Sequence, residues 1–147
     1  MPRIKIDLPD LFSFIAIIPI RITDINYGNH VGNDAVLSII HEARMQFLAK
    51  LGYTELNLDG IGLIMTDVGI EFKKEIFYGD TLEIKIAVTD FTSVGFDLYY
   101  LLEKQKDNSK LTVAIAKTGM VCYDYDRKKI TAVPATVKEK LMSVSTN

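Results

Sequence analysis

The sequence predicts an α+β fold in which a curved antiparallel sheet of about five or six strands wraps around one central helix. Residues 33–51 carry an apolar residue at every third or fourth position, which is typical of an amphipathic helix. Much of the remaining chain alternates apolar and polar residues, as half-buried strands do. A short polar segment, 106–110, joins two such strands as in an antiparallel hairpin. A lone helix buries its apolar side in such a chain only if the sheet curls around it.

Length and composition predict a single domain over residues 1–147, because this is close to the commonest domain size. Hydrophobic residues make up 48% and charged residues 24%, as in ordinary globular proteins. The formal charge of -2 speaks against nucleic acid as a partner, since no basic field is available to hold its backbone. Cys122 is the only cysteine, so no intramolecular disulfide forms and a cytoplasmic location is expected.

The first strand is predicted over residues 12–23, which are apolar and β-branched. Its most apolar part, 11–20, is too short to span a bilayer and contains Pro19. No small-residue cleavage motif follows it. We therefore expect neither a signal peptide nor a membrane span, and the turn-forming residues 24–30 end the strand in a loop.

The helix is predicted to follow this loop, with Asn33 or Asp34 as its capping residue and Gly52 as its end. Its stripe is broad, which suits a helix packed against the concave side of a sheet. The residues expected in this stripe are Val36, Leu37, Ile40, Ala43, Phe47, Leu48 and Leu51.

Four strands are predicted after the helix. Residues 61–76 form a long strand with a bend at Gly69, and a turn at 78–80 leads into a strand that alternates apolar Leu82, Ile84, Ile86 and Val88 with polar residues. Residues 96–104 and 111–125 form the hairpin. The polar tail from 136 to 147 is expected to be a helical turn that frays.

The loop and the helix carry a motif, Asp24-Ile-Asn26-Tyr-Gly-Asn-His30-Val-Gly-Asn33, followed by Glu42-Ala-Arg. This resembles the 4-hydroxybenzoyl-CoA thioesterase-like branch of the hot-dog superfamily, whose usual pattern is Asp-x-Asp-x-x-Gly-His-Val-Asn-Asn and then Glu-Ala-Arg. Segments 70–72 and 78–80 also resemble the family, so the similarity spans nearly the whole chain.

The resemblance implies a hot-dog fold and an acyl-CoA thioesterase. Such an enzyme hydrolyses the thioester of an acyl-CoA, or of an acyl carrier protein, to a free acid and a thiol. The resemblance further implies a homodimer or homotetramer, with coenzyme A as part of the substrate and no separate cofactor.

The motif departs from the family pattern at two positions. Asn26 stands where many members place the aspartate that acts as nucleophile or general base, and Gly32 replaces the first asparagine of the pair. An amide cannot take a proton from water at neutral pH. The alternatives are therefore a non-catalytic acyl-thioester binding protein and, with less support, a hot-dog dehydratase.

Thioester hydrolysis needs donors for the developing oxyanion and a group that activates water. The backbone amides around Val31, Gly32, Asn33 and Asp34, at the start of the helix, are the predicted donors. For the water, Asn26 is predicted to orient it, while His30, Asp24 or a carboxylate of a partner subunit, in that order, removes its proton.

Glu42 faces away from the apolar stripe, so it points to solvent or, as the resemblance implies, serves the partner's site. Arg44 falls near the stripe and is interpreted as structural, with a carboxylate partner expected if it is buried. His41 and Glu42 lack the four-residue spacing of metal-binding histidines, so no metal is predicted. Asp67 in its strand is explained by a bulge or an edge strand as well as by a site role.

Coenzyme A carries phosphates that lysines can bind. Lys73 and Lys74 are the favoured candidates, ahead of the basic cluster 127–129. The acyl group is predicted to lie along the helix against Phe47 and Leu63.

Overall fold

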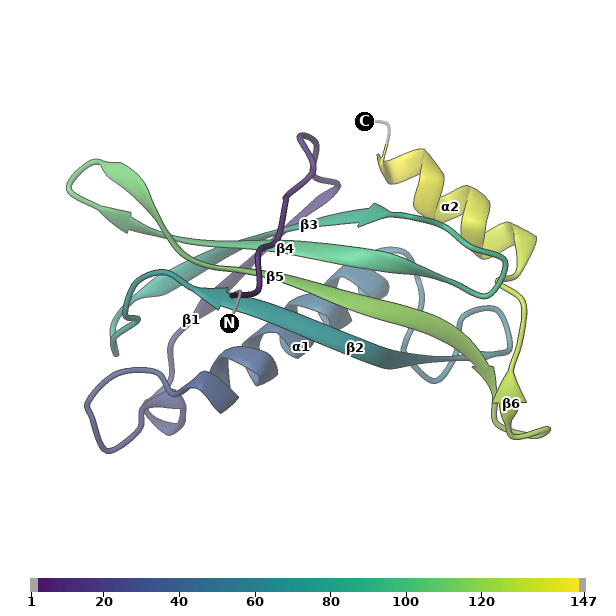
Figure 1. Ribbon diagram of the computed structural model, residues 1–147, viewed down its shortest axis with the longest axis horizontal. Coiled ribbons are helices and arrows are strands. Elements are labelled where there is room, and N and C mark those ends of the chain that lie inside the picture. Colours follow the sequence, from purple (N-terminus) through teal and green to yellow (C-terminus); the bar gives the residue numbers. More distant parts are fainter. Residues whose placement is uncertain (1–2, 146–147) are drawn as a thin grey trace.

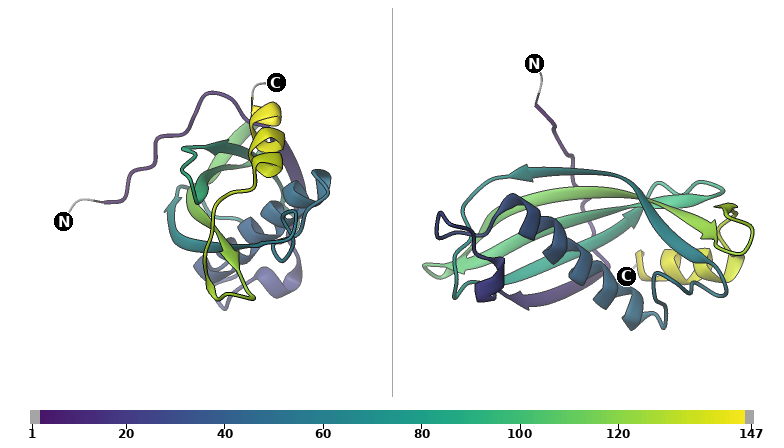
Figure 2. Two further views of the ribbon diagram at one scale, coloured as in Figure 1. Left: turned by 90° about the vertical axis from the view of Figure 1, so that its right-hand side faces the viewer. Right: turned by 90° about the horizontal axis from the view of Figure 1, so that it is seen from below.

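The computed structural model describes residues 3–145 and confirms a curved antiparallel sheet around a central helix (Figure 1). The strand order is β1-β3-β4-β5-β2, with β6 paired to β5, and every pair is antiparallel. Figure 2 shows the sheet curling around α1. In chain order the elements are β1 (Phe14–Pro19), the 3-10 turn η1 (Ile22–Asp24), α1 (Asn33–Lys50), β2 (Gly62–Phe72), β3 (Thr81–Thr89), β4 (Gly95–Lys106), β5 (Ser109–Asp124), β6 (Lys129–Ile130) and α2 (Ala135–Ser145).

The first strand and the helix start differ from the prediction. β1 ends at Pro19, short of the predicted residue 23, and a proline cannot extend a ladder through its missing amide. The turn η1 follows, where Asp24 Oδ2 accepts the Arg21 amide at 2.8 Å. Gly32 is the helix cap and makes no side-chain bond, so the predicted cap at Asn33 or Asp34 was wrong.

Two further details differ from the prediction. β2 ends at Phe72 rather than at residue 76, and its register against β5 shifts between Met65 and Asp67, which places a bulge there. The β4–β5 hairpin closes through Asp107 and Asn108, whose φ angles of 50° and 66° match a tight two-residue turn rather than a five-residue loop.

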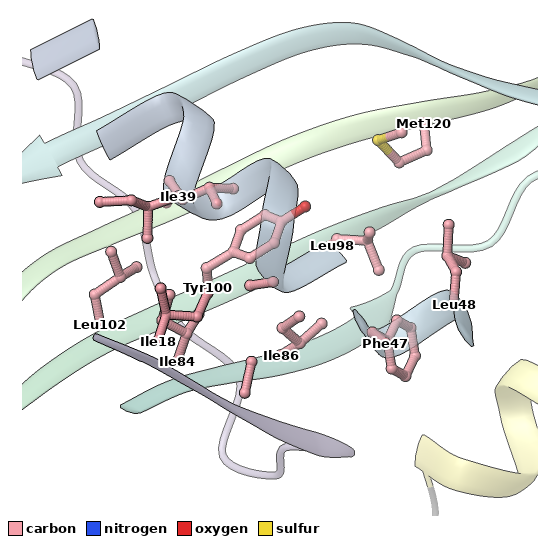
Figure 3. Packing of buried hydrophobic residues seen from close by; sticks show 14 of the residues in the cluster. Ile18, Ile39, Phe47, Leu48, Ile84, Ile86, Leu98, Tyr100, Leu102 and Met120 are labelled. Atoms are coloured by element: carbon pink, nitrogen blue, oxygen red, sulfur yellow. The ribbon is translucent and has the colours of Figure 1, made fainter. Parts of the chain in front are cut away.

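The core lies between α1 and the concave face of the sheet. The alternation in β3 is confirmed, because Leu82, Ile84 and Ile86 are fully buried. Figure 3 shows Ile84 and Ile86 with Leu98 and Tyr100 of β4, packed beneath α1. Within α1 the buried residues are Val36, Ile39, Ile40, Ala43, Arg44, Phe47 and Leu48, so Ile39 takes the place predicted for Leu37.

The tail is not a frayed turn. α2 runs over residues 135–145, and its Val137 and Leu141 are fully buried in the same core. In the sequence, these two apolar residues lie only one helical turn apart. A stripe this short is too weak a periodic signal to predict a helix.

The edge strand β2 leaves several apolar side chains partly exposed. α1 packs mainly against β1 and β3, and β2 forms an edge of the sheet. On β2, Met65, Val68 and Phe72 are 38%, 38% and 48% exposed. An edge strand with exposed apolar side chains is a natural surface for pairing with another chain.

Candidate active site

The loop before α1 is a tight turn that fixes Asn26. The Asn26 amide donates to His30 O at 2.9 Å, and Asn29, at φ 66°, donates to Asn26 O at 3.2 Å. Asn26 Oδ1 accepts the Gly28 amide at 2.8 Å. Because a backbone N–H only donates, the atom it meets is the carboxamide oxygen, and Asn26 Nδ2 is the group left to donate. Asn26 is therefore positioned as a hydrogen-bond donor.

His30 is half-buried, and its Nδ1 lies 3.1 Å from Val31 O. A carbonyl oxygen only accepts, so the neutral ring carries its proton on Nδ1 and keeps a lone pair on Nε2. A Cβ placed on Gly28 would lie 3.4 Å from this Nε2 and 3.2 Å from Asn26 Oδ1. The turn therefore brings together the His30 and Asn26 side chains.

Only some of the backbone amides predicted as oxyanion donors are free to bind an anion. The Val31 amide donates to Ile76 O at 2.8 Å and the Gly32 amide to Asp24 O at 3.4 Å, which corrects their assignment as free donors. Within residues 3–145 the amides of Asn33 and Asp34 have no hydrogen-bond partner. These are the amides that a helix start offers to an anion.

A pocket of about 310 Å³ opens beside the helix start and is lined by His30, Asn33, Phe72, Lys73 and Lys74, among others. The structure thus brings His30 and the two predicted lysines to one place.

The two lysines differ in their partners. Lys73 Nζ lies 3.2 Å from Glu71 Oε1, and Glu71 Oε2 accepts the Ile6 amide at 2.6 Å. The hydrogen bond from the Ile6 amide and, to a smaller extent, the contact with Lys73 lower the pKa of Glu71 below its usual value. This carboxyl is therefore kept ionised. The Lys74 side chain has no partner in the described part of the chain, so it is the cation free to meet a phosphate.

A second pocket, of about 440 Å³, lies between β1 and α1. It is lined by Asp24 and Glu42 together with apolar side chains such as Ile17, Ile39 and Met45. Asp24 is only 6% exposed and is held by Arg21, while Glu42 accepts Gln46 Nε2 at 2.9 Å. Asp24 and Glu42 therefore lie on another side of α1 from His30 and the lysines.

The residues predicted to hold the acyl group lie elsewhere. Phe47 is 1% exposed and packs on Phe14 with ring centroids 5.6 Å apart, and Leu63 is 3% exposed. Neither lines either of these two pockets. The structure places both in the core, and along the helix it offers the groove with Ile17, Ile39 and Met45 instead.

Other candidates are explained structurally. Asp67 follows the β2 bulge and pairs with Lys117 at 3.2 Å, as the bulge interpretation expects. Arg127 pairs with Asp124, and the cluster 127–129 lies at the end of the molecule away from the loop 24–30 (Figure 1). Across residues 3–145, no cluster of three or more histidine, cysteine or acidic side chains is arranged to hold a metal ion. No helix in that range is long and apolar enough to cross a membrane.

The sequence analysis offered Asp34 only as a helix cap and gave its side chain no role in the chemistry. A Cβ placed on Gly32 would lie 2.7 Å from Asp34 Oδ1 and 3.6 Å from Asn26 Nδ2. Gly32 has φ -73°, so space rather than backbone conformation requires the glycine. An acid directly after the loop, at the second helical position, was the signal that could have drawn attention to it.

Residues 20–141 match the model of the thioesterase-like superfamily. The chain belongs to this superfamily. It is 30% identical over 114 residues to a 1,4-dihydroxy-2-naphthoyl-CoA hydrolase of Microcystis aeruginosa, a match covering 76% of this chain and 80% of that one.

Solved structures share the fold. A 1,4-dihydroxy-2-naphthoyl-CoA thioesterase from Synechocystis superposes with a TM-score of 0.75 at 18% identity, over 91% of this chain and 96% of that one. An Asp-to-Asn variant of 4-hydroxybenzoyl-CoA thioesterase in complex with 4-hydroxybenzoyl-CoA superposes with a TM-score of 0.80 at 18% identity, over 87% and 97%. The predicted family, hot-dog fold and thioester-hydrolase class are confirmed.

Proposed function

We propose that this thioesterase hydrolyses acyl-CoA, releasing a free acid and coenzyme A, without a cofactor of its own and in the cytoplasm. The observation that carries the proposal is the pocket at the start of α1, where His30 and the free cation of Lys74 meet the unpaired amide of Asn33. A thioester carbonyl set against this helix start receives donors for its developing negative charge. The phosphates of coenzyme A then lie toward the lysines.

The test is release of thiol from a panel of acyl-CoAs of graded chain length, followed with a thiol-trapping reagent. The protein adds little background, because Cys122 is fully buried and burial raises the pKa of its thiol to about 11. We expect turnover by the wild type and much slower turnover by His30→Ala and Asn26→Ala. Equal release by all three proteins would contradict the catalytic assignment.

A second candidate function is acyl-thioester binding without hydrolysis. It is favoured by Asn26, whose carboxamide cannot accept the proton of an attacking water. Calorimetric binding of an acyl-CoA, with no thiol released over hours, would select this alternative.

The two lysines make a matched pair for testing the phosphate contact. We expect Lys74→Ala to raise KM for acyl-CoA roughly fivefold, as loss of one exposed charge contact of about 1 kcal/mol would do, with kcat unchanged. Lys73→Ala should raise KM less, because Glu71 already engages that ammonium. The measurement is KM at low and high salt. A larger effect for Lys73 than for Lys74 would contradict the assignment.

The protein is also proposed to work as a homodimer or homotetramer. β2 supports this, because it is an 11-residue edge strand that leaves Met65, Val68 and Phe72 partly exposed. Light scattering on a sizing column should give a mass of two or four chains. Replacing Val68 with lysine should shift that mass toward one chain, and a monomeric wild type would contradict the prediction.

A further inference from the structure

The missing side chain of Gly32 lets two polar side chains approach the helix start, at a place that we call the Gly32 niche. Asn26 Nδ2 and Asp34 Oδ1 lie 3.6 Å and 2.7 Å from the position that a Cβ on Gly32 would take. Asp34 is exposed, and among residues 3–145 its carboxylate has no hydrogen-bond or ion-pair partner. Beside Gly32, therefore, a carboxylate and an amide N–H group that have no partner among residues 3–145 lie close together.

Other acids named for the site are less suited to accept a proton there. Asp24 is buried, and both of its carboxylate oxygens are held by Arg21. Glu42 lies eight residues after Asp34, about 12 Å along the helix at roughly 1.5 Å per residue. His30 Nε2 lies 3.4 Å from the position of a Cβ on Gly28, near Asn26 Oδ1, and is not among the three atoms nearest to the position of a Cβ on Gly32. Asp34 is thus the acid placed beside the donors.

We propose that Asp34 is the general base of thioester hydrolysis and that Asn26 Nδ2 is a donor to the oxyanion. This inference rests on the proposed function and deepens it. In the family pattern an aspartate stands at the position of Asn26. Here the carboxylate borders the niche from the helix side, four residues after His30 rather than four before it.

The step balances with water as the only co-reactant. Asp34 takes one proton from water as the water oxygen bonds to the carbonyl carbon, and the carbonyl oxygen becomes an oxyanion. Asn26 Nδ2 and the free amide of Asn33 donate to that oxyanion. The tetrahedral centre then collapses, the carbon–sulfur bond breaks, and the leaving thiolate takes the proton from Asp34. The acid product loses its own proton to solvent.

Exchanging the two side chains tests this arrangement. Asp34→Asn should lower kcat by about 10²-fold or more, with KM and melting temperature nearly unchanged. Asn26→Asp alone should lower kcat by about 10²-fold, because it removes a donor and adds a like charge. The double variant should regain at least about tenfold over Asp34→Asn, since it holds one carboxylate and one amide across the same niche.

The pH profile separates this role from a structural one. The kcat of the wild type should fall at acid pH, and this fall should be absent in Asp34→Asn. The control variant Glu139→Gln, on the exposed side of α2, should keep both the wild-type kcat and the fall at acid pH. The proposal is overturned if Asp34→Asn keeps kcat within about twofold of wild type, or if the double variant stays as slow as Asp34→Asn. A wild type that releases no thiol from any acyl-CoA would instead refute the proposed function.

Discussion

Replacing Arg44 with alanine is expected to lower the free energy of unfolding by about 1.5–3 kcal/mol, the usual worth of a hydrogen bond to a charged group, because its buried contacts and its packing are lost. Arg44 is 4% exposed in the core side of α1. Its Nε donates to Glu55 Oε2 at 3.0 Å and its Nη1 to Tyr100 Oη at 3.2 Å. Tyr100 Oη in turn lies 2.7 Å from Thr118 Oγ1. The guanidinium therefore joins the helix to β4, to β5 and to the loop that follows α1.

The charge of Arg44 is held in place by its surroundings. Burial disfavours it, but the Tyr100 hydroxyl and the Glu55 carboxylate outweigh burial and raise the pKa of Arg44 above its usual value. Glu55 also meets His41 on the exposed side, so its carboxylate serves both groups. After the truncation, Tyr100 and Thr118 still satisfy each other, while Glu55, 21% exposed, turns to water. The main losses are the tether and the packing of the side chain.

Urea unfolding at neutral pH measures this effect, with Lys50→Ala at the exposed end of α1 as the control. Arg44→Met, which keeps most of the apolar volume, should be less destabilised than Arg44→Ala. A loss below about 1 kcal/mol for Arg44→Ala would mean that the network does not anchor the helix.

The parts of the fold that could be predicted from the sequence are those with a pattern that repeats over several helical turns or strand residues. The stripe of α1 and the alternation of β3 reflect burial against one large surface, and both were predicted nearly residue by residue. Local details depended on distant partners. The bulge after Met65 is set by how the edge strand β2 meets β5, which no local pattern reveals.

The site was predicted in part for the same reason. His30, Lys73 and Lys74 were named from the sequence, and the structure brings them to one pocket because the end of β2 lies beside the start of α1. The amide of Val31 was named as free, but Ile76, 45 residues further along the chain, accepts it. Asp34 acquires its significance only through the close approach of its carboxylate to Gly32 and Asn26, which is a property of the folded loop.

Adding a Cβ at Gly32 is the most economical way to disturb the site without removing a polar group. Gly32→Ala is expected to lower kcat by about 10²-fold, because the new Cβ would lie 2.7 Å from Asp34 Oδ1 and must push the carboxylate away. The backbone accepts alanine at φ -73°, and exchanging glycine for alanine at a helix cap costs about 1 kcal/mol or less. The fold should therefore survive while the reaction slows.

Steady-state kinetics with thermal unfolding of the same samples separate the two effects. Gly69→Ala is the matched control, since its Cβ would meet only Ile4 and Ile6 side chains at 3.6 Å and 3.8 Å, which is ordinary packing. If Gly32→Ala retained kcat while Asp34→Asn lost it, Asp34 would act from a rotamer other than the one seen over Gly32. If both variants lost kcat with KM unchanged, the lost interaction would be one made only in the transition state. The carboxylate would then act on the reacting carbonyl from its position beside Gly32.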